Sequence, residues 1–266
     1  MNGCCEALSI TILGTTTCTP EKGANTASFA VNRRVAVDTG WYFTDRLLAC
    51  GISPLDIEAV VFTHCHHDHI MGLPQILFYY GIQGEKRSKR PLRIYGPAGE
   101  IRRVVDDARR FLQFDRYPEL CFDIEVTELR GGAELDICGL RARTCSARHS
   151  VPGLCYRFDN AAGASVVFSG DTAFNPDLID LSRGAGLLVH EASYGARSVR
   201  EDVKWGHSGA PDAAEVARQA GVARLAIVHC SQANLLQALE AARPTFPASF
   251  IPPQGEEMSV SPKDEA

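Results

Sequence analysis

Thr63-His64-Cys65-His66-His67-Asp68-His69 holds four of the chain's eight histidines, together with one carboxylate. The segment directly follows the apolar run Ala59 to Thr63, which predicts a buried strand. Imidazole nitrogen and carboxylate oxygen are ligands that borderline divalent metals prefer, and a strand end holds them without the cost of ordering a loop. The segment therefore predicts a metal site on the loop that leaves this strand.

Other candidate ligands stand alone further along the chain, near the ends of predicted strands. They are His149, Asp171 and His229. A histidine-rich surface loop is the alternative interpretation of residues 63–69. These isolated downstream residues favour the metal site instead, because together they supply the mixed nitrogen and oxygen donors that such a site needs.

Short apolar strands alternate with helical patterns along the whole chain. Strands are predicted at Leu8 to Leu13, Ser28 to Val31, Arg34 to Val37, Ala59 to Thr63, Leu92 to Tyr95, Phe122 to Glu128, Arg141 to Ser146, Leu154 to Phe158, Ser165 to Ser169, Leu187 to His190 and Leu225 to His229. Helices are predicted at Pro54 to Ile57 after a Ser53 cap, Leu73 to Tyr80, Glu100 to Leu112, Pro176 to Leu181, Pro211 to Ala220 and Asn234 to Ala242. Two β-rich halves, each ending in helices, predict two sheets packed face to face with helices outside.

The domain organisation follows from the absence of a Ser/Gly/Pro-rich linker. We expect a single domain over residues 1–251, and a polar, flexible tail over residues 252–266. The chain has 266 residues, 45% of them hydrophobic and 22% charged, which excludes disordered, collagen-like and coiled-coil proteins. We expect a cytoplasmic protein, since we find no targeting segment and no membrane helix, and we expect the ten cysteines to be mostly reduced.

The charge is unevenly distributed. The formal net charge is −5, although residues 81–150 carry an excess of basic side chains. The one dense basic cluster, Lys86, Arg87, Lys89 and Arg90, is either a solvated loop or a contact for a phosphorylated or nucleic-acid substrate. The acidic balance of the whole chain excludes a dedicated nucleic-acid binder of the usual basic type.

The ordered set of candidate ligands resembles the metallo-β-lactamase superfamily. The matching residues are His64, His66, Asp68, His69, His149, the turn Ser169-Gly170-Asp171-Thr172, and His229. The resemblance extends from Leu13 to about Ser231 and implies an α/β fold, a four-layer αββα sandwich with two metals at the edge between the sheets. It also implies that His64, His66 and His149 hold the first metal, that Asp68, His69 and His229 hold the second, and that Asp171 bridges both.

Two divalent ions that share a water lower its pKa and stabilise the attacking and leaving oxygens of a hydrolysis reaction. Zn²⁺ is the first choice for these ligands, with Mn²⁺ or Fe as alternatives. Asp38 matches an aspartate of the superfamily at an early strand end. We expect it to orient the metal loop by hydrogen bonds, the alternative being a simple turn residue. Cys65 and His67 should point away from the metals.

Further segments resemble the phosphodiesterase branch typified by ribonuclease Z, which trims transfer-RNA 3′ ends. They are Gly72-Leu73-Pro74, Pro91 to Pro97, His149 to Pro152, and His190 to Ser193 together with Gly206-His207-Ser208. Cleavage of a phosphodiester needs a proton for the leaving oxygen. We assign His207 as general acid and phosphate contact, Glu191 as the residue that orients it, and Asp68 as a base that assists the bridging water. His190 is expected to be a bystander.

The chain also departs from that branch. Ribonuclease Z carries a long basic arm between the third histidine and the bridging aspartate, whereas the segment between His149 and Asp171 has room only for a hairpin. We therefore expect a small phosphodiester, such as a cyclic nucleotide or a nucleotide derivative, rather than a large RNA. The alternatives are a ribonuclease Z-type tRNA 3′-processing endonuclease, an arylsulfatase-like ester hydrolase, and an iron-dependent oxidoreductase or a low-activity accessory protein of the same fold. The resemblance also implies a homodimer.

Overall fold

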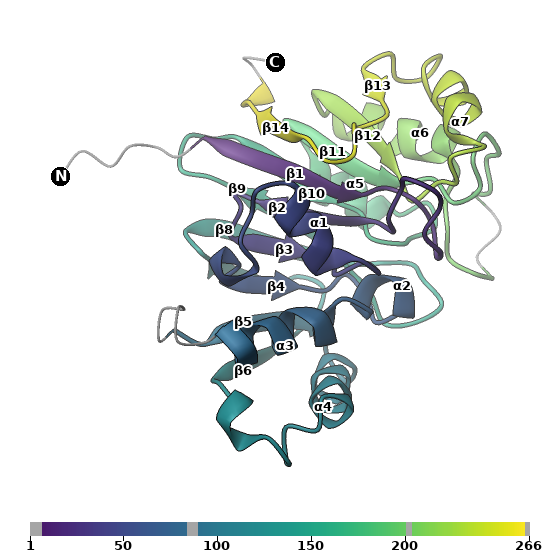
Figure 1. Ribbon diagram of the computed structural model, residues 1–266. Helices are drawn as coiled ribbons and strands as arrows, with labels where there is room; N and C mark the ends of the chain where they lie inside the picture. The colour runs from purple at the N-terminus through teal and green to yellow at the C-terminus, as the bar shows by residue number, and fades with distance from the viewer. Residues whose placement is uncertain (1–6, 84–89, 201–203, 264–266) are drawn as a thin grey trace.

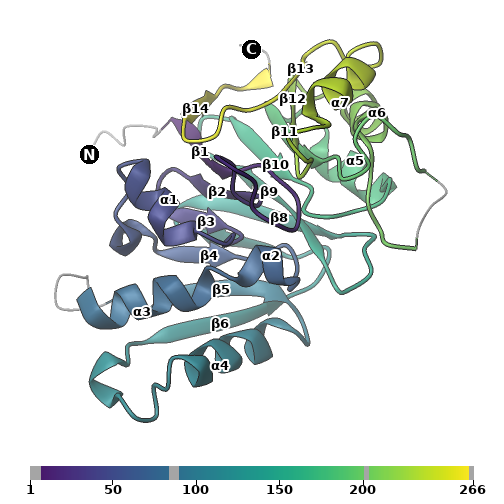
Figure 2. The same ribbon diagram turned by 45° about the vertical axis from the view of Figure 1, so that its right-hand side comes forward.

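The computed structural model describes residues 7–83, 90–200 and 204–263. Two seven-stranded sheets lie face to face, and helices cover the outer face of each (Figures 1 and 2). This arrangement confirms the predicted αββα sandwich.

The first sheet has the order β14-β1-β2-β3-β4-β5-β6. Its strands are β1 (Leu8–Gly14), β2 (Ser28–Val31), β3 (Val35–Val37), β4 (Ala59–Val61), β5 (Leu92–Pro97), β6 (Ile124–Leu129) and β14 (Glu257–Val260). Neighbours from β14 to β3 pair antiparallel, and neighbours from β3 to β6 pair parallel. The carboxyl ends of β3 to β6 therefore meet at one edge of the sheet.

The second sheet has the order β13-β12-β11-β10-β9-β8-β7. Its strands are β7 (Glu134–Ile137), β8 (Leu140–Ser146), β9 (Leu154–Asp159), β10 (Ser165–Phe168), β11 (Leu187–Glu191), β12 (Arg224–Val228) and β13 (Ser249–Phe250). Neighbours from β7 to β10 pair antiparallel, and neighbours from β10 to β13 pair parallel. Each sheet thus combines an antiparallel half with a parallel half.

The helices form the two outer layers. The helices beside the first sheet are α1 (Phe43–Ala49), η1 (Pro54–Asp56), α2 (His67–Ile70), α3 (Leu73–Gln83), α4 (Ile101–Phe111) and η3 (Pro118–Leu120). The helices beside the second sheet are α5 (Pro176–Ser182), α6 (Ala210–Ala220) and α7 (Leu235–Ala242). The predicted Ser53 cap of η1 is confirmed, since its side chain accepts a hydrogen bond from the Leu55 backbone N–H.

The strands near the centre are apolar on both faces because each sheet is covered on both sides. In β3, Val35 and Val37 pack between the sheets, while Ala36 packs toward the helices. In β11, Val189 faces the other sheet and Leu188 faces the helix layer. Three apolar layers result, and they hold the strand ends that carry the candidate ligands.

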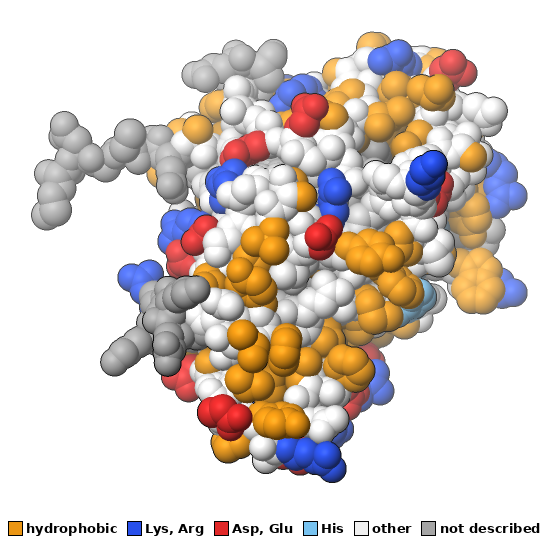
Figure 3. Space-filling view, in the orientation of Figure 1, with side chains coloured by type: hydrophobic (Ala, Val, Ile, Leu, Met, Phe, Trp, Pro, Cys, Tyr) orange, Lys and Arg blue, Asp and Glu red, His pale blue; other side chains and the backbone are white. Residues whose placement is uncertain are grey.

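The helix layer beside the first sheet leaves some apolar surface exposed. Figure 3 shows hydrophobic side chains on the face that α1 and α3 cover. Leu48 of α1 and Phe78 and Ile82 of α3 are each about half exposed. The homodimer implied by the resemblance stays a prediction.

One prediction needs correction. Within the range 252–266 expected to be a flexible tail, residues Glu257–Val260 form β14, which pairs antiparallel with β1 from Leu8↔Val260 to Thr11↔Glu257. The polar composition hid this strand, but the edge of β1 offers backbone partners, and the Val260 side chain is buried between the sheets. Residues 264–266 lie outside the described part of the chain.

Smaller differences concern local structure. Helix α1 and strands β7 and β13 were not predicted, and residues 67–70 form one turn of helix rather than a loop. Of the predicted basic cluster, Lys86, Arg87 and Lys89 lie outside the described residues. The eight cysteines in the described part are free thiols. No helix there has the length and apolar character that crossing a membrane requires.

Candidate metal centre

The candidate ligands meet at the edge where the carboxyl ends of the parallel strands from both sheets lie together. His64 follows β4, Asp171 follows β10 and His229 follows β12. His149 lies in the loop between β8 and β9, and the isolated bridge between His64 and Gly153 joins this loop to the end of β4. Residues far apart in the sequence therefore converge, as is usual for ligand sites at the carboxyl ends of parallel strands.

The candidate donor atoms of the described residues fall into five overlapping sets. Two sets that share no residue are His64, His66 and His149, and Asp68, His69 and His229. Within each set the donor atoms lie within 4.8 Å of one another. These two sets contain the residues that the resemblance assigns to the first and to the second metal.

The separations within the sets suit metal coordination. His66 Nδ1 lies 3.1 Å from His64 Nε2 and 3.0 Å from His149 Nε2. In the second set, Asp68 Oδ2 lies 3.4 Å from His69 Nε2 and 3.2 Å from His229 Nε2. Ions with bonds of about 2.0–2.2 Å hold neighbouring ligand atoms roughly 3.0–3.6 Å apart. Both sets thus have the spacing of ligands around one ion each.

Asp171 lies between the two sets. Its Oδ2 atom is 3.6 Å from His64 Nε2 in the first set, and 3.6 and 3.5 Å from His69 Nε2 and His229 Nε2 in the second. The side chain is buried, with 4% of its surface exposed. The Asp171 carboxylate therefore faces both sets. A shared negative charge in this position would reduce the repulsion between two closely spaced cations.

Hydrogen bonds fix the orientation of four imidazoles. Each ring directs Nε2 toward the centre, while Nδ1 donates to an outer acceptor. These contacts are His64 to Thr63 Oγ1 at 3.1 Å, His69 to Asp38 Oδ2 at 2.8 Å, His149 to the Gly206 carbonyl at 2.9 Å, and His229 to Ser193 Oγ at 2.8 Å. Each of the four rings therefore turns its Nε2 toward the centre, where that nitrogen is placed to act as a ligand.

Asp38 forms hydrogen bonds to the loop that carries the candidate ligands. Besides His69, its carboxylate accepts hydrogen bonds from the Thr63 backbone N–H at 2.8 Å and from the Thr63 hydroxyl at 2.7 Å. Asp38 has a backbone φ of +56°, a conformation that aspartate tolerates better than most residues. The side chain thus joins the end of β3 to the loop that begins after β4.

The ionisation of the site suits cations. Burial lowers the pKa of His64 well below its ordinary value, and burial also lowers the pKa of His149, so both rings stay neutral. Burial would raise the pKa of Asp171, but the neighbouring histidines outweigh it and hold this carboxyl well below its usual range. His69 Nε2 is buried without a hydrogen-bond partner, which a bound ion would satisfy. These residues fit a pair of divalent ions.

Glu191 and His207 form an ion pair beside the two sets. His207 Nδ1 lies 2.9 Å from Glu191 Oε1 and 3.8 Å from Asp171 Oδ2. Partial burial lowers the pKa of His207, but the hydrogen bond to Glu191 and the charges of Glu191 and Asp171 outweigh it and raise this pKa to about 9. His207 is thus held as a cation at neutral pH, with 21% of its side chain exposed.

Ser193 and Gly206 are two functional residues that were not predicted individually, although their segments were. The Ser193 hydroxyl donates to Glu191 Oε2 at 2.8 Å and lies 3.2 Å from His207 Nδ1, so it connects this pair to His229. Gly206 acts through its backbone carbonyl, which no side-chain pattern reveals. A Cβ atom there would lie 2.4 Å from His149 Cα, so only glycine allows this close contact.

The predicted bystanders lie away from the centre. The His67 side chain is 60% exposed. Cys65 is half-buried, and burial raises the pKa of its thiol to about 12. His190 is fully buried on the helix side of β11, and its Nδ1 donates to the Glu191 carbonyl at 2.8 Å. None of the three belongs to the sets of donor atoms found in the described residues.

The chain is similar to proteins of a known family. Residues 33–230 match the model of the β-lactamase superfamily domain. A ribonuclease Z of Methanothermobacter thermautotrophicus is 31% identical, over 92% of this chain and 94% of that protein. Human tRNase Z, short form, has a TM-score of 0.78 at 22% identity, covering 95% of this chain and 99% of that one. The metallo-β-lactamase fold protein YhfI of Bacillus subtilis has a TM-score of 0.77 at 20% identity, covering 96% and 100%.

Proposed function

The chain belongs to the β-lactamase superfamily, in its ribonuclease Z-like branch, and we propose that it cleaves a phosphodiester bond. Members of this branch are metal-dependent hydrolases that act on ester bonds, and this chain is one of them. The observation that carries this proposal is the Glu191–His207 pair beside the candidate metal ligands. A phosphodiester has a leaving oxygen that needs a proton and non-bridging oxygens that need positive charge. A protonated imidazole supplies both.

In this proposal two divalent ions occupy the centre. His64, His66 and His149 would hold one ion, Asp68, His69 and His229 would hold the other, and Asp171 would contact both. When bound, such a pair supplies an activated water near neutral pH and positive charge on the phosphate. Zn²⁺ is the proposed metal, and Mn²⁺ or Fe would suit the same nitrogen and oxygen donors.

The remaining roles belong to side chains. His207 would donate its proton to the leaving oxygen and contact the phosphate, while Glu191 keeps the ring charged and Ser193 supports Glu191. Burial would raise the pKa of Asp68, but the close contacts with His229 and His69 outweigh burial and hold this pKa far below the usual range. A carboxylate of such low basicity orients the attacking water as a hydrogen-bond acceptor and does not retain the proton.

The proposed substrate is a small phosphodiester, such as a cyclic nucleotide or a nucleotide derivative. It is supported by the hairpin of β9 and β10, which occupies the chain between His149 and Asp171 and leaves no room for a long arm. The net charge of −5 also disfavours a large polyanion.

The second candidate is processing of tRNA 3′ ends. It is favoured by the relatives named ribonuclease Z, of which one aligns over 92% of this chain at 31% identity. The catalytic groups proposed above serve both substrates equally, so the choice depends on the surfaces around the centre.

A substrate panel on metal-analysed protein tests the proposal. It should include bis-p-nitrophenyl phosphate, cyclic nucleotides, a precursor tRNA, a phosphomonoester and an aryl sulfate. We expect hydrolysis of phosphodiesters with two metals bound per chain. Activity on the aryl sulfate alone, or an O₂-dependent activity with bound iron, would overturn the proposal, and inactivity on the whole panel would favour an accessory protein.

A further inference from the structure

A cavity of about 190 Å³ opens beside the candidate metal centre, between the ends of the two sheets. Pro97, Leu129 and Arg130 line it from the ends of β5 and β6. Ser146 and Pro152 line it from the β8–β9 region. The cavity therefore lies at the same carboxyl edge of the sheets as the candidate ligands.

Gly153 forms a wall between the cavity and the centre. It lines the cavity and pairs with His64 as an isolated bridge, and a Cβ atom on it would lie 3.6 Å from His64 Cβ. The next residue, Leu154, also lines the cavity and donates its backbone N–H to the Thr63 carbonyl at 2.7 Å. The cavity is thus joined to the first ligand set through one stretch of backbone.

The distance suits the span of a nucleotide. His64 follows β4, and the cavity lies at the ends of the next two strands, β5 and β6. Neighbouring strands lie roughly 4.8 Å apart, so β5 and β6 lie roughly 5 and 10 Å from β4 across the sheet. A group attached to a phosphate at the centre through one sugar can reach the cavity.

The chemistry of the lining is apolar with one positive charge. Pro97, Leu129 and Pro152 provide apolar walls. Arg130 is exposed and is the one charged side chain among the described lining residues, while Ser146 adds a hydroxyl. A planar ring with carbonyl oxygens matches such a lining, because proteins hold unstacked bases against flat side chains and arginine guanidinium groups.

The size restricts the occupant. Pockets for drug-sized ligands usually span about 300–1,000 Å³, so about 190 Å³ is enough for one ring system and not for a whole nucleotide. The sugar and the phosphate would remain outside, toward the centre.

We propose that this cavity is a nucleobase subsite, which receives the base of the nucleotide whose phosphate lies at the metal centre. The base would pack against Pro97 and Pro152, with Arg130 donating to its carbonyl oxygens. The inference rests on the proposed phosphodiesterase function and makes nucleotides the substrate class.

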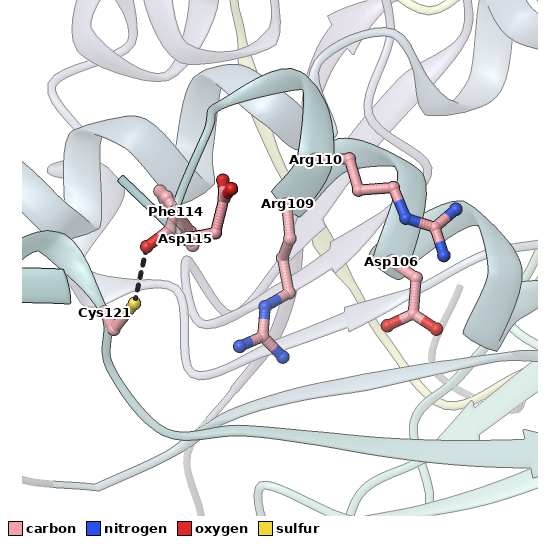
Figure 4. Close-up of a pocket in the computed structure, with 6 residues that line it drawn as sticks. All are labelled: Asp106, Arg109, Arg110, Phe114, Asp115 and Cys121. Atoms are coloured by element: carbon pink, nitrogen blue, oxygen red, sulfur yellow. Dashed lines mark hydrogen bonds between the residues drawn. The ribbon is translucent and has the colours of Figure 1, made fainter. Parts of the chain in front are cut away.

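A second, larger cavity, of about 430 Å³, does not share these properties. It is lined by Asp106, Arg109, Arg110, Phe114, Asp115 and Cys121 (Figure 4). Two carboxylates face this cavity alongside two guanidinium groups, which disfavours a phosphorylated ligand. The larger cavity also lies at the carboxyl end of α4. This helix begins near the end of β5 that borders the candidate ligands and leads away from it. The larger cavity supplies a control residue, the exposed Arg109.

Two substrates with the same leaving group test the subsite. They are thymidine 5′-(p-nitrophenyl phosphate) and methyl p-nitrophenyl phosphate, which differ only in the nucleoside. We expect the wild type to favour the nucleoside ester about tenfold or more in kcat/KM, as one hydrogen bond from a charged donor such as Arg130 provides. Ala98 also lines the cavity, so Ala98→Phe would fill it. Arg130→Gln and Ala98→Phe should each lower this preference about fivefold or more through KM. Arg109→Gln should leave it unchanged.

The outcomes separate the two hypotheses. Hydrolysis of both esters without a preference for the nucleoside, or with a preference that both variants retain, overturns the subsite and leaves the phosphodiesterase proposal standing. Hydrolysis of neither ester by the metal-loaded wild type overturns both. If Ala98→Phe fails to fold, Arg130→Gln decides, because its side chain is at the surface.

Discussion

Replacement of Glu191 by Gln removes the charge that keeps His207 protonated while preserving the shape of the side chain. With Glu191 in place, the pKa of His207 is raised to about 9 from an ordinary value of 6.5. Because its pKa is about 9, the His207 ring is protonated and can donate a proton at pH values below 9. It loses this role as pH rises through about 9. Without the carboxylate, the loss should begin near pH 6.5.

The expected magnitude follows from these two values. At pH 8 a group with a pKa of 9 is roughly 90% protonated, and a group with a pKa of 6.5 is roughly 3% protonated, so kcat/KM should fall about 30-fold in the variant at this pH. Bound divalent ions lower the pKa of His207 in the wild type and in the variant alike. We therefore compare the pH at which kcat/KM falls on the alkaline side of the pH profile in the two proteins. Near pH 6 the two activities should approach each other.

The assay is the pH profile of kcat/KM between pH 6 and 10 with a dinucleotide, whose alkoxide leaving group needs a proton. Bis-p-nitrophenyl phosphate serves as the comparison substrate, because p-nitrophenolate leaves without assistance. Glu215→Gln is a matched control, since Glu215 also has an altered pKa, of about 2, through its hydrogen bond to Arg218 on the surface of α6. An alkaline limb that does not move in Glu191→Gln, or an equal loss on both substrates, would refute the assignment of His207 as the acid.

Three further changes test separate parts of the site. His207→Ala should lower kcat on a dinucleotide by about 10²-fold or more while two metals per chain remain in elemental analysis, and unchanged turnover would remove the acid role. Asp171→Asn should reduce the bound metal from two ions to one, and a full complement of two would contradict bridging. Asp38→Asn should weaken metal binding about 10–100-fold in a chelator competition, because His69 loses its carboxylate acceptor, and wild-type affinity would make Asp38 only a turn residue.

The fold and the candidate ligands could be predicted because their signals are local. The apolar runs that end in His64 or Asp171 indicate both the strands and the residues at their ends. Strand β14 was not predicted, because its alternation of polar residues with Met258 and Val260 covers only four residues, and its stability comes from pairing with β1.

Within the site, residues that act through the backbone or through a small side chain could not be predicted individually from the sequence. Gly206 orients His149 with a carbonyl oxygen, and Ser193 contacts Glu191, His207 and His229 at once. Such roles depend on which loops meet in space. The nucleobase cavity is a similar case, because its walls come from strands of both sheets.

We propose that two metal ions lie on either side of Asp171. The most direct measurement is an anomalous difference map from crystals of the zinc-loaded protein. We expect two peaks roughly 3.5–4 Å apart, one among His64, His66 and His149, and the other among Asp68, His69 and His229. A single peak at full zinc occupancy, or peaks away from Asp171, would contradict this proposal.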